Sequence, residues 1–299
     1  MKKNRAKYVG NKKSNLDIKM LQGVCEIIRS CDFPFNTFAV EDGHILYLTN
    51  INPLNEKELD RDKIYGYFTE KGRILQSLSD DSLLLPEEYY TLTGETIEPF
   101  LIGFPILPRK GYVELRKMVG SEGLSLEDVS KPVLAVSRAV KKSAEKGTYH
   151  SNLYSEDNIY YNPVEDKAMF DDFANVQVNG LYVEYSAASR LAKTAFAYSH
   201  LFDRETQRVD ENFSKIALHL LFIRVATGKY PPVFEKSLFT KPKVRELCDG
   251  IGLSDTQFED NLLRISDERE LVYPDTAIKE LKLTHELVPS DNSYTFMRR

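Results

Sequence analysis

The stretch of chain between His150 and Val176 gathers the residue types that catalytic and metal sites use. It holds an imidazole, several side-chain amides and a pair of adjacent carboxylates, Asp171 and Asp172. Carboxylate oxygens are hard ligands suited to Mg²⁺, so this pair predicts a divalent-cation site. The structural alternative is that neighbouring aspartates at a strand end point in different directions and hold no ion.

The same stretch resembles two motifs of eukaryote-like protein kinases, H-R-D-L-x-x-x-N and D-F-G. The matching residues are His150–Ser151–Asn152–Leu153, then Asn158–Ile159, and finally Asp172–Phe173–Ala174. A long amphipathic helix precedes the first motif and a predicted hairpin joins the two, as the family's fold requires. Where such a site is intact, the resemblance implies ATP and Mg²⁺ as cofactors, held by Asn158 and Asp172 with Asp171 beside them.

Two further segments extend the resemblance to about residues 36 to 235. Val209–Asp210 and the run from Ala226 to Pro231 are similar to the two ends of the family's buried helix. Phe100–Arg109 is similar to its fifth strand and hinge, as found in bacterial kinase-like proteins. The resemblance implies a bilobal kinase-like fold, with a small strand-rich N-lobe and a larger helical C-lobe. It also implies that Asp210 holds the catalytic-loop backbone, although an N-cap aspartate looks the same in a sequence.

The catalytic loop departs from the family pattern at its central residue. The aspartate that accepts or orients the substrate hydroxyl proton is replaced by Asn152, whose neutral amide cannot act as that base. Five residues instead of four then separate Asn152 from Asn158, and Asp157 is a candidate substitute for either missing role. We therefore assign no catalytic residue with certainty, and the resemblance gives His150 a packing role.

The predicted small lobe lacks two parts of an ATP site. The segment before residue 66 contains glycine only at positions 10, 23 and 43, so it has no glycine-rich loop. The candidate strand His44–Thr49 contains no lysine to anchor phosphates. Glu70 stands where the family's helix glutamate would bind that lysine and complete a cofactor site. The alternative is that Glu70 is simply solvated, as a glutamate on an amphipathic helix usually is.

These departures favour a pseudokinase, a kinase-like scaffold or regulator that binds a protein partner and transfers no phosphoryl group. The alternative is an atypical ATP-dependent phosphotransferase in which Asp172 holds the metal and Asp157, Asp171 or Glu156 replaces the missing base. Positioning and charge supply most of the catalysis in phosphoryl transfer, so such a relocation is chemically feasible. A third alternative is an unrelated α+β adaptor.

Composition and charge argue against several other classes. The net charge is 40 − 45 = −5, which is unfavourable for a dedicated nucleic-acid binder. The three cysteines, Cys25, Cys31 and Cys248, form no CxxC pair, so neither a structural zinc site nor a disulfide framework is expected. No export signal follows the basic start, and the apolar runs are too short to span a bilayer. These features predict a cytoplasmic protein without membrane insertion.

The elements that position these residues follow from hydrophobic spacing. Helical spacing of apolar residues predicts helices over Leu16–Ser30, Lys63–Leu78, Leu126–Lys146, Phe213–Gly228, Lys241–Gly250, Ser254–Ile265 and Thr276–Leu281. Short β-rich runs beside turns predict strands within Asn36–Thr49, Leu83–Leu85, Glu98–Pro105, Ile159–Tyr161 and Ala168–Phe170. The order predicts an α+β chain with an N-terminal extension (1–31), an N-lobe (32–108) and a helical C-lobe (109–299).

Two surfaces are candidates for contact with a protein partner. The segment Tyr182–Phe202 has no counterpart of the family's A-P-E motif, is helix-prone, and carries aromatic residues of the kind enriched at interfaces. The alternative is that these rings complete the core of the helical lobe. The helices beyond Lys241 are the second candidate surface.

Overall fold

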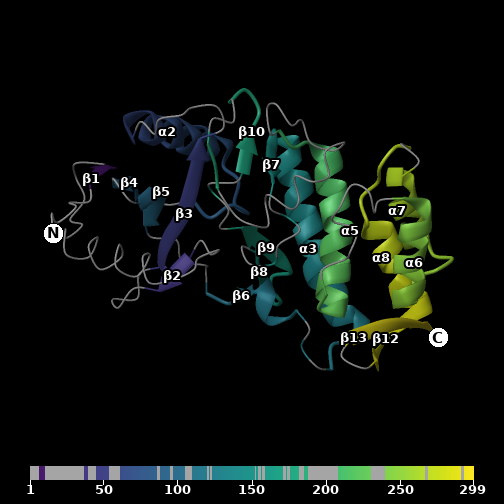
Figure 1. The fold of residues 1–299 in the computed structure, drawn as a ribbon. Helices are drawn as coiled ribbons and strands as arrows, with labels where there is room; N and C mark the ends of the chain where they lie inside the picture. The colour runs from purple at the N-terminus through teal and green to yellow at the C-terminus, as the bar shows by residue number, and fades with distance from the viewer. Residues whose placement is uncertain are drawn as a thin grey trace.

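The computed structural model is an α+β arrangement of small antiparallel sheets and α-helices (Figure 1). The structure describes residues 7–10, 37–39, 45–53, 61–85, 88–94, 97–104, 110–119, 121, 123–151, 153, 156, 159–170, 173, 176–181, 185–187, 208–229, 240–266, 269–290 and 293–299. The N-terminal sheet and helix α2 lie on one side of the molecule, and the helices of the C-terminal half lie on the other.

Six short strands form one antiparallel sheet in the order β1-β4-β5-β3-β11, with β2 also paired to β3. The strands are β1 (Lys7–Gly10), β2 (Thr37–Ala39), β3 (Ile45–Pro53), β4 (Glu88–Gly94), β5 (Ile97–Phe104) and β11 (Tyr185–Ala187). The strand pair predicted within Asn36–Thr49 is confirmed, because β2 and β3 pair with Ala39 opposite Ile45. The predicted strand Glu98–Pro105 corresponds to β5 within one residue at each end.

Helix α2 (Arg61–Leu78) lies between β3 and β4 in the chain and confirms the helix predicted over Lys63–Leu78. Phe68, Lys71 and Leu75 recur at helical spacing and form its buried face. The strand predicted at Leu83–Leu85 is wrong. Leu83 makes a single parallel bridge to Phe170. A turn at Asp80–Ser82 leads directly into this bridge. The Leu84 amide donates to the Phe170 carbonyl, and the Phe170 amide donates to the Ser82 carbonyl.

Helix α3 (Leu126–Glu145) is the helix predicted over Leu126–Lys146. Its N-terminus has a capping box, in which the Asp128 amide donates to the Ser125 hydroxyl at 3.1 Å. The Ser125 amide donates in return to the Asp128 carboxylate at 2.9 Å. Gly147 ends the helical turn with a φ of 71°, a left-handed conformation that favours glycine. The buried face of α3 packs against α5, α8 and the strands that follow it.

Two short sheets are formed largely by strands that follow α3 in the chain. β7 (Thr148–His150) pairs with β10 (Val176–Val178). β8 (Ile159–Asn162) pairs with β9 (Lys167–Phe170) and with β6 (Val113–Glu114), and it confirms the two strands predicted there. The β8–β9 hairpin thus lies between His150 and Phe173 in the sequence. The pairing of β7 with β10 then brings Val176 opposite His150.

Helix α5 (Glu211–Thr227) is buried on nearly every side, as predicted for Phe213–Gly228. Asp210 has the N-cap role that was the alternative to its family role, since its carboxylate accepts a hydrogen bond from the Phe213 amide at 2.9 Å. Near the centre of α5, the Phe222 ring packs against Phe258 and Phe296, with centroid separations of 5.2 and 5.8 Å. This helix is therefore the structural centre of the C-terminal half.

The last sixty residues contain helices α6 (Lys241–Ile251), α7 (Gln257–Ser266) and α8 (Asp275–Thr284), which match the three predicted in that region. α7 begins three residues later than predicted because the Thr256 hydroxyl accepts from the Glu259 amide as a helix cap does. A hairpin that was not predicted follows, β12 (His285–Ser290) and β13 (Ser293–Arg298). Phe296 belongs to this hairpin, which therefore completes the packing around α5.

Two further expectations concern segments that are described only in part or not at all. The helix expected within Tyr182–Phe202 is wrong at Tyr185–Ala187, which is the strand β11; the rest of that segment lies outside the described residues. The helix predicted at Leu16–Ser30 also lies outside them. Within the described part of the chain, no helix combines the length and the apolar character needed to cross a membrane.

Candidate functional site

Most of the residues predicted to line the cleft are not among those that the structure describes. Asn152, Asp157, Asn158, Asp171 and Asp172 lie outside the described residues. Several residues next to them in the chain are described, among them Ser151, Leu153, Glu156 and Phe173. Within the described part of the chain, no group of three or more His, Cys, Asp or Glu side chains is arranged to hold a metal ion.

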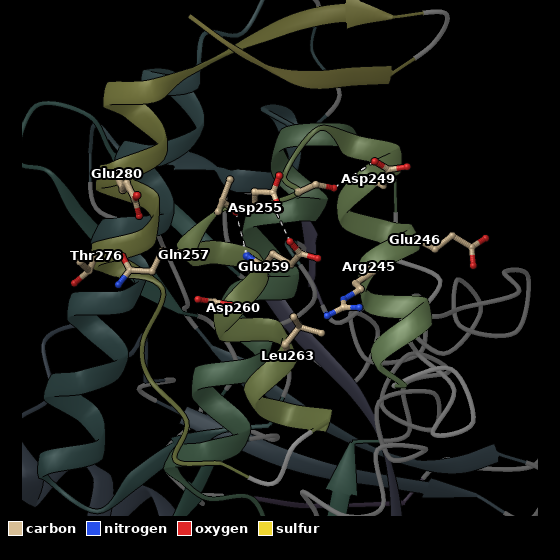
Figure 2. Close-up of a pocket in the computed structure, with 12 residues that line it drawn as sticks. Arg245, Glu246, Asp249, Asp255, Gln257, Glu259, Asp260, Leu263, Thr276 and Glu280 are labelled. Carbon is tan, nitrogen blue, oxygen red and sulfur yellow. Dashed lines mark hydrogen bonds between the residues drawn. The ribbon is translucent and has the colours of Figure 1, made fainter.

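A large concave surface lies elsewhere, on the C-terminal helices (Figure 2). It encloses about 1080 Å³ between α6, α7 and α8, and its charged residues are one arginine and six carboxylates: Arg245, Glu246, Asp249, Asp255, Glu259, Asp260 and Glu280. Glu259 accepts a hydrogen bond from the Asp255 amide at 2.7 Å, and Glu246 pairs with Lys243 at 2.6 Å. This surface belongs to the second of the two predicted partner regions.

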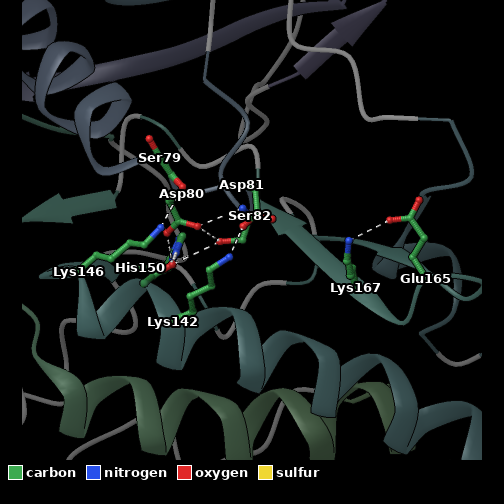
Figure 3. Close-up of polar contacts among 10 residues, drawn as sticks. Ser79, Asp80, Asp81, Ser82, Lys142, Lys146, His150, Glu165 and Lys167 are labelled. Atoms are coloured by element: carbon green, nitrogen blue, oxygen red, sulfur yellow. Dashed lines mark hydrogen bonds and ion pairs between the residues drawn. The ribbon is translucent and has the colours of Figure 1, made fainter.

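A buried polar cluster lies where the turn after α2 meets α3 and β7 (Figure 3). The Ser143 hydroxyl donates to Asp80 Oδ2 at 2.6 Å, and the Ser82 hydroxyl donates to Asp80 Oδ1 at 2.6 Å. His150 Nε2 lies 3.5 Å from the same Ser143 oxygen. All four side chains are buried. We call these four residues the Asp80 cluster.

His150 has the packing role that the sequence predicted for it. Its side chain is buried, its ring centroid lies 4.2 Å from that of Phe170, and Nδ1 has no hydrogen-bond partner among the described residues. Burial lowers the pKa of His150 to about 4; the charge of Asp80 opposes this shift and the charge of Lys71 adds to it. The imidazole is therefore neutral at neutral pH.

The carboxylate of Asp80 is stabilised by its donors. Burial acts to raise the pKa of Asp80, but the hydrogen bonds from Ser143 and Ser82 outweigh burial and hold this pKa below its usual value. A charged carboxylate surrounded by hydroxyl donors and covered from solvent fixes the positions of three segments. The cluster is suited to holding the turn, α3 and β7 together.

Exposed polar contacts lie beside the Asp80 cluster on α3 and farther away on the β8–β9 hairpin (Figure 3). Lys142 pairs with Asp81 at 2.5 Å, and Lys167 pairs with Glu165 at 3.4 Å. Lys146 donates to the Ser79 carbonyl at 2.9 Å. Water and salt screen exposed pairs of this kind, so they add little stability to the fixed arrangement beneath them.

Lys71 is the residue that the sequence analysis missed. Its side chain is 2% exposed, and its Nζ lies 5.6 Å from the ring centroid of Phe68 and 5.7 Å from that of Phe173. Both distances are within the range of cation–π attraction. Its position in the sequence could have indicated burial, because Lys71 lies three residues after Phe68 and four before Leu75, on the apolar stripe of α2.

Glu70, predicted as a helix glutamate that completes a cofactor site, is turned to solvent. Its side chain is 46% exposed, and both carboxylate oxygens accept hydrogen bonds from Arg73 on the same helix, at 2.9 and 2.6 Å. The side-chain hydrogen bond from Arg73 lowers the pKa of Glu70. The sequence analysis expected the carboxylate of Glu70 to face a cofactor site. On α2 it is instead the neighbouring cation, Lys71, that is buried.

Glu156 is a buried polar residue within the predicted catalytic loop. Its Oε1 accepts from Nη2 and Nε of Arg224 on α5, at 2.7 and 3.1 Å, and the Glu156 side chain is 3% exposed. Arg224 also donates to the Gly228 carbonyl. The loop between β7 and β8 is therefore anchored to α5 by an ion pair. The sequence analysis named Glu156 only as a replacement base.

No model of a known protein family matches the chain, and no curated protein matches it.

Proposed function

We propose that this chain is a pseudokinase with a bilobal kinase-like fold, a scaffold or regulator that acts through protein contacts without phosphoryl transfer. The observation that carries the proposal is the order and contact of its elements around Phe173. Helix α2 stands between β3 and β4, α3 precedes β7, and the β8–β9 hairpin separates His150 from Phe173. Phe173 then packs on Phe68 of α2, with ring centroids 5.9 Å apart. These relations support the kinase-like reading of the motifs in the sequence.

The charge pattern supports a role without catalysis. β3 contains no lysine, and Glu70 on α2 is engaged by Arg73 at the surface. The strand lysine and helix glutamate that a working kinase pairs are thus not available as a pair from these two elements. Together with Asn152 in place of the catalytic aspartate, this means that the phosphate-anchoring lysine and the catalytic base of a working kinase are both missing from their usual positions.

The alternative is an active, atypical phosphotransferase that uses ATP and Mg²⁺. Of its three candidate bases, Glu156 is buried and bound to Arg224, which makes it unsuited to proton transfer. Asp157 and Asp171 remain as candidate bases, with Asp172 on the metal. This alternative needs a phosphate anchor that no residue of β3 supplies.

The proposed partner is a protein, and the proposed contact region is the concave surface of α6, α7 and α8. It belongs to one of the two candidate partner surfaces that the sequence predicts, and it is open to solvent. A cytoplasmic setting is part of the proposal and rests on the cysteine usage; Cys248 is a free, buried thiol.

The test is a phosphotransfer assay with labelled ATP and Mg²⁺ or Mn²⁺, on the chain alone and with generic protein substrates. We expect no transfer from the wild type or from Asn152→Asp, because the phosphate-anchoring groups are absent in both. Robust transfer that disappears in Asp172→Ala would overturn the proposal in favour of the alternative.

A thermal-shift titration with ATP, ADP and GTP in the presence of Mg²⁺ separates the two readings further. A nucleotide present at 100 times its Kd stabilises a protein by about 2.7 kcal/mol. We expect no shift for the pseudokinase. A shift that Asp172→Ala removes would support the phosphotransferase.

A further inference from the structure

A buried ammonium group lies where α2 meets the segment that follows β9. The side chain of Lys71 is 2% exposed, and its Nζ lies 5.6 Å from the ring centroid of Phe68 and 5.7 Å from that of Phe173. The ring centroid of Tyr67 lies 6.0 Å from the same Nζ. All three rings are themselves buried. We call the rings of Tyr67, Phe68 and Phe173 the aromatic cage.

The aromatic cage is assembled from two parts of the chain that are distant in sequence. Tyr67 and Phe68 lie four and three residues before Lys71, a spacing that brings side chains together on one face of a helix. Their rings meet edge to face, with centroids 5.1 Å apart. Phe173 comes from beyond β9 and packs on Phe68, and the strand that follows it, β10, also contacts α2. The ammonium group therefore lies at the contact between these two segments.

The charge of Lys71 has an energetic role that its hydrocarbon stem cannot supply. An ammonium group loses favourable hydration on burial, and the electron-rich faces of aromatic rings attract a cation most strongly where water is excluded. The effect of this charge extends to β7. Burial lowers the pKa of His150, and the charge of Lys71 lowers it further. An uncharged side chain of the same length would fill the space without attracting the rings.

We infer that the aromatic cage is an ammonium-binding site, which the chain fills with its own Lys71. The charge of Lys71, in addition to its packing, holds Phe173 on α2. The ligand class of the cage is a primary alkylammonium ion, because the part of a lysine side chain beyond Cβ has the structure of propylammonium. The inference goes beyond the proposed function, since neither a pseudokinase nor a phosphotransferase requires a lysine at this place.

A double-mutant cycle measures the attraction between the charge and one ring. Lys71→Met removes the charge at similar length, and Phe173→Leu removes the ring but keeps an apolar side chain. We expect Lys71→Met to raise the unfolding equilibrium constant at least about threefold more in the wild-type background than in Phe173→Leu. Phe222→Leu, on the buried helix α5, is the matched control and should be additive with Lys71→Met. Additivity with Phe173→Leu, or equal coupling to both phenylalanines, would overturn the inference.

Refilling the cage tests whether it selects a cation. Lys71→Ala removes the atoms that propylammonium can replace. We expect propylammonium chloride to raise the melting temperature of this variant by about 2 °C or more, relative to sodium chloride at the same ionic strength. The uncharged n-propanol should not raise it, and neither compound should stabilise the wild type, whose cage is filled. Equal stabilisation by propylammonium and n-propanol, or by neither, would show that the cage does not bind an ammonium group.

The two tests do not depend on each other or on the proposed function. The variants of the cycle keep most of the core volume, so the cycle remains decisive where Lys71→Ala fails to fold. Both readouts are stabilities measured without nucleotide. Failure of this inference therefore leaves the phosphotransfer test of the proposed function unaffected.

Discussion

Ser143 links the carboxylate of the Asp80 cluster to its imidazole. It donates to Asp80, its hydroxyl oxygen lies 3.5 Å from His150 Nε2, and it is completely buried. A buried carboxylate that loses a donor keeps its desolvation cost without the compensating hydrogen bond. The contribution of Ser143 is therefore larger than that of an ordinary helix serine.

We expect Ser143→Ala to lower the free energy of unfolding by about 1–3 kcal/mol, because Asp80 keeps only its Ser82 donors. The matched control is Ser130→Ala, since Ser130 is equally buried on α3 but donates only to the Leu126 carbonyl of its own helix. Urea unfolding followed by circular dichroism measures both. Equal losses in the two variants would contradict the special role of Asp80.

The buried histidines predict how stability depends on pH. Burial lowers the pKa of both His150 and His219 to about 4, below the ordinary value of 6.5. The unfolded chain therefore binds more protons than the folded protein between pH 6.5 and 4. Their stabilising contribution is fully present above pH 6.5. It decreases as the pH falls, with a slope approaching about 1.4 kcal/mol per pH unit for each histidine.

Unfolding free energies measured by urea titration between pH 7.5 and 4.5 test this sign. His150→Gln should reduce the slope by about one proton, and His219→Gln should do the same independently. A slope that neither substitution changes would show that these imidazoles are not the groups that titrate.

At the scale of elements, α6 depends on a glycine at its end. Gly252 has a φ of 75°, and a Cβ there would lie 1.9 Å from the main-chain oxygen of Phe296. Gly252→Ala must therefore push β13 away from α6. We expect a loss of at least a few kcal/mol, from the strained backbone together with the lost packing of Phe296.

Gly250→Ala is the matched control for this prediction. Gly250 lies inside α6, is exposed, and a Cβ there would meet nothing within 4 Å. Alanine should stabilise the helix by about 0.5–1 kcal/mol at this position. Thermal melts of both variants should move in opposite directions, and a stabilised Gly252→Ala would show that α6 and β13 are not in contact.

The Glu156–Arg224 ion pair joins helix α5 to the loop before β8. Removing one partner of a buried ion pair leaves an uncompensated charge, so we expect Glu156→Gln to cost about 3–5 kcal/mol. Glu127→Gln is the control, because Glu127 is exposed and its pair with Lys131 is an i,i+4 surface pair, so its loss should change stability far less. Comparable losses in chemical denaturation would show that the loop is not anchored through Arg224.

Long helices with a periodic apolar pattern could be predicted from the sequence. Short strands that exist only through pairing with another strand could not. α2, α3 and α5 carry enough apolar residues at helical spacing to be recognised alone. β7, β10 and β11 are three residues long and are strands only because a partner lies beside them. The same limit applies to the site: Lys71 stood on an apolar stripe, but its aromatic neighbour Phe173 is far away in sequence.

At the scale of the whole molecule, α5 determines whether the C-terminal half folds. Leu220 on this helix is 2% exposed, whereas Leu283 on α8 is 80% exposed. Leu220→Asp places an unpaired charge in the core and should abolish cooperative unfolding. Leu283→Asp should change the free energy of unfolding by no more than about 0.5 kcal/mol. A near-wild-type calorimetric melt of Leu220→Asp would contradict the central position of α5.

The contact between Phe222 and Phe296 has a consequence for the order of events during synthesis. The two rings pack together but are 296 − 222 = 74 residues apart in the chain. At translation rates of about 5–20 residues per second, α5 emerges roughly 4–15 s before the strand that covers it. During this interval its apolar surface lacks β13, so a nascent chain of this protein should engage ribosome-associated chaperones until Phe296 has left the exit tunnel.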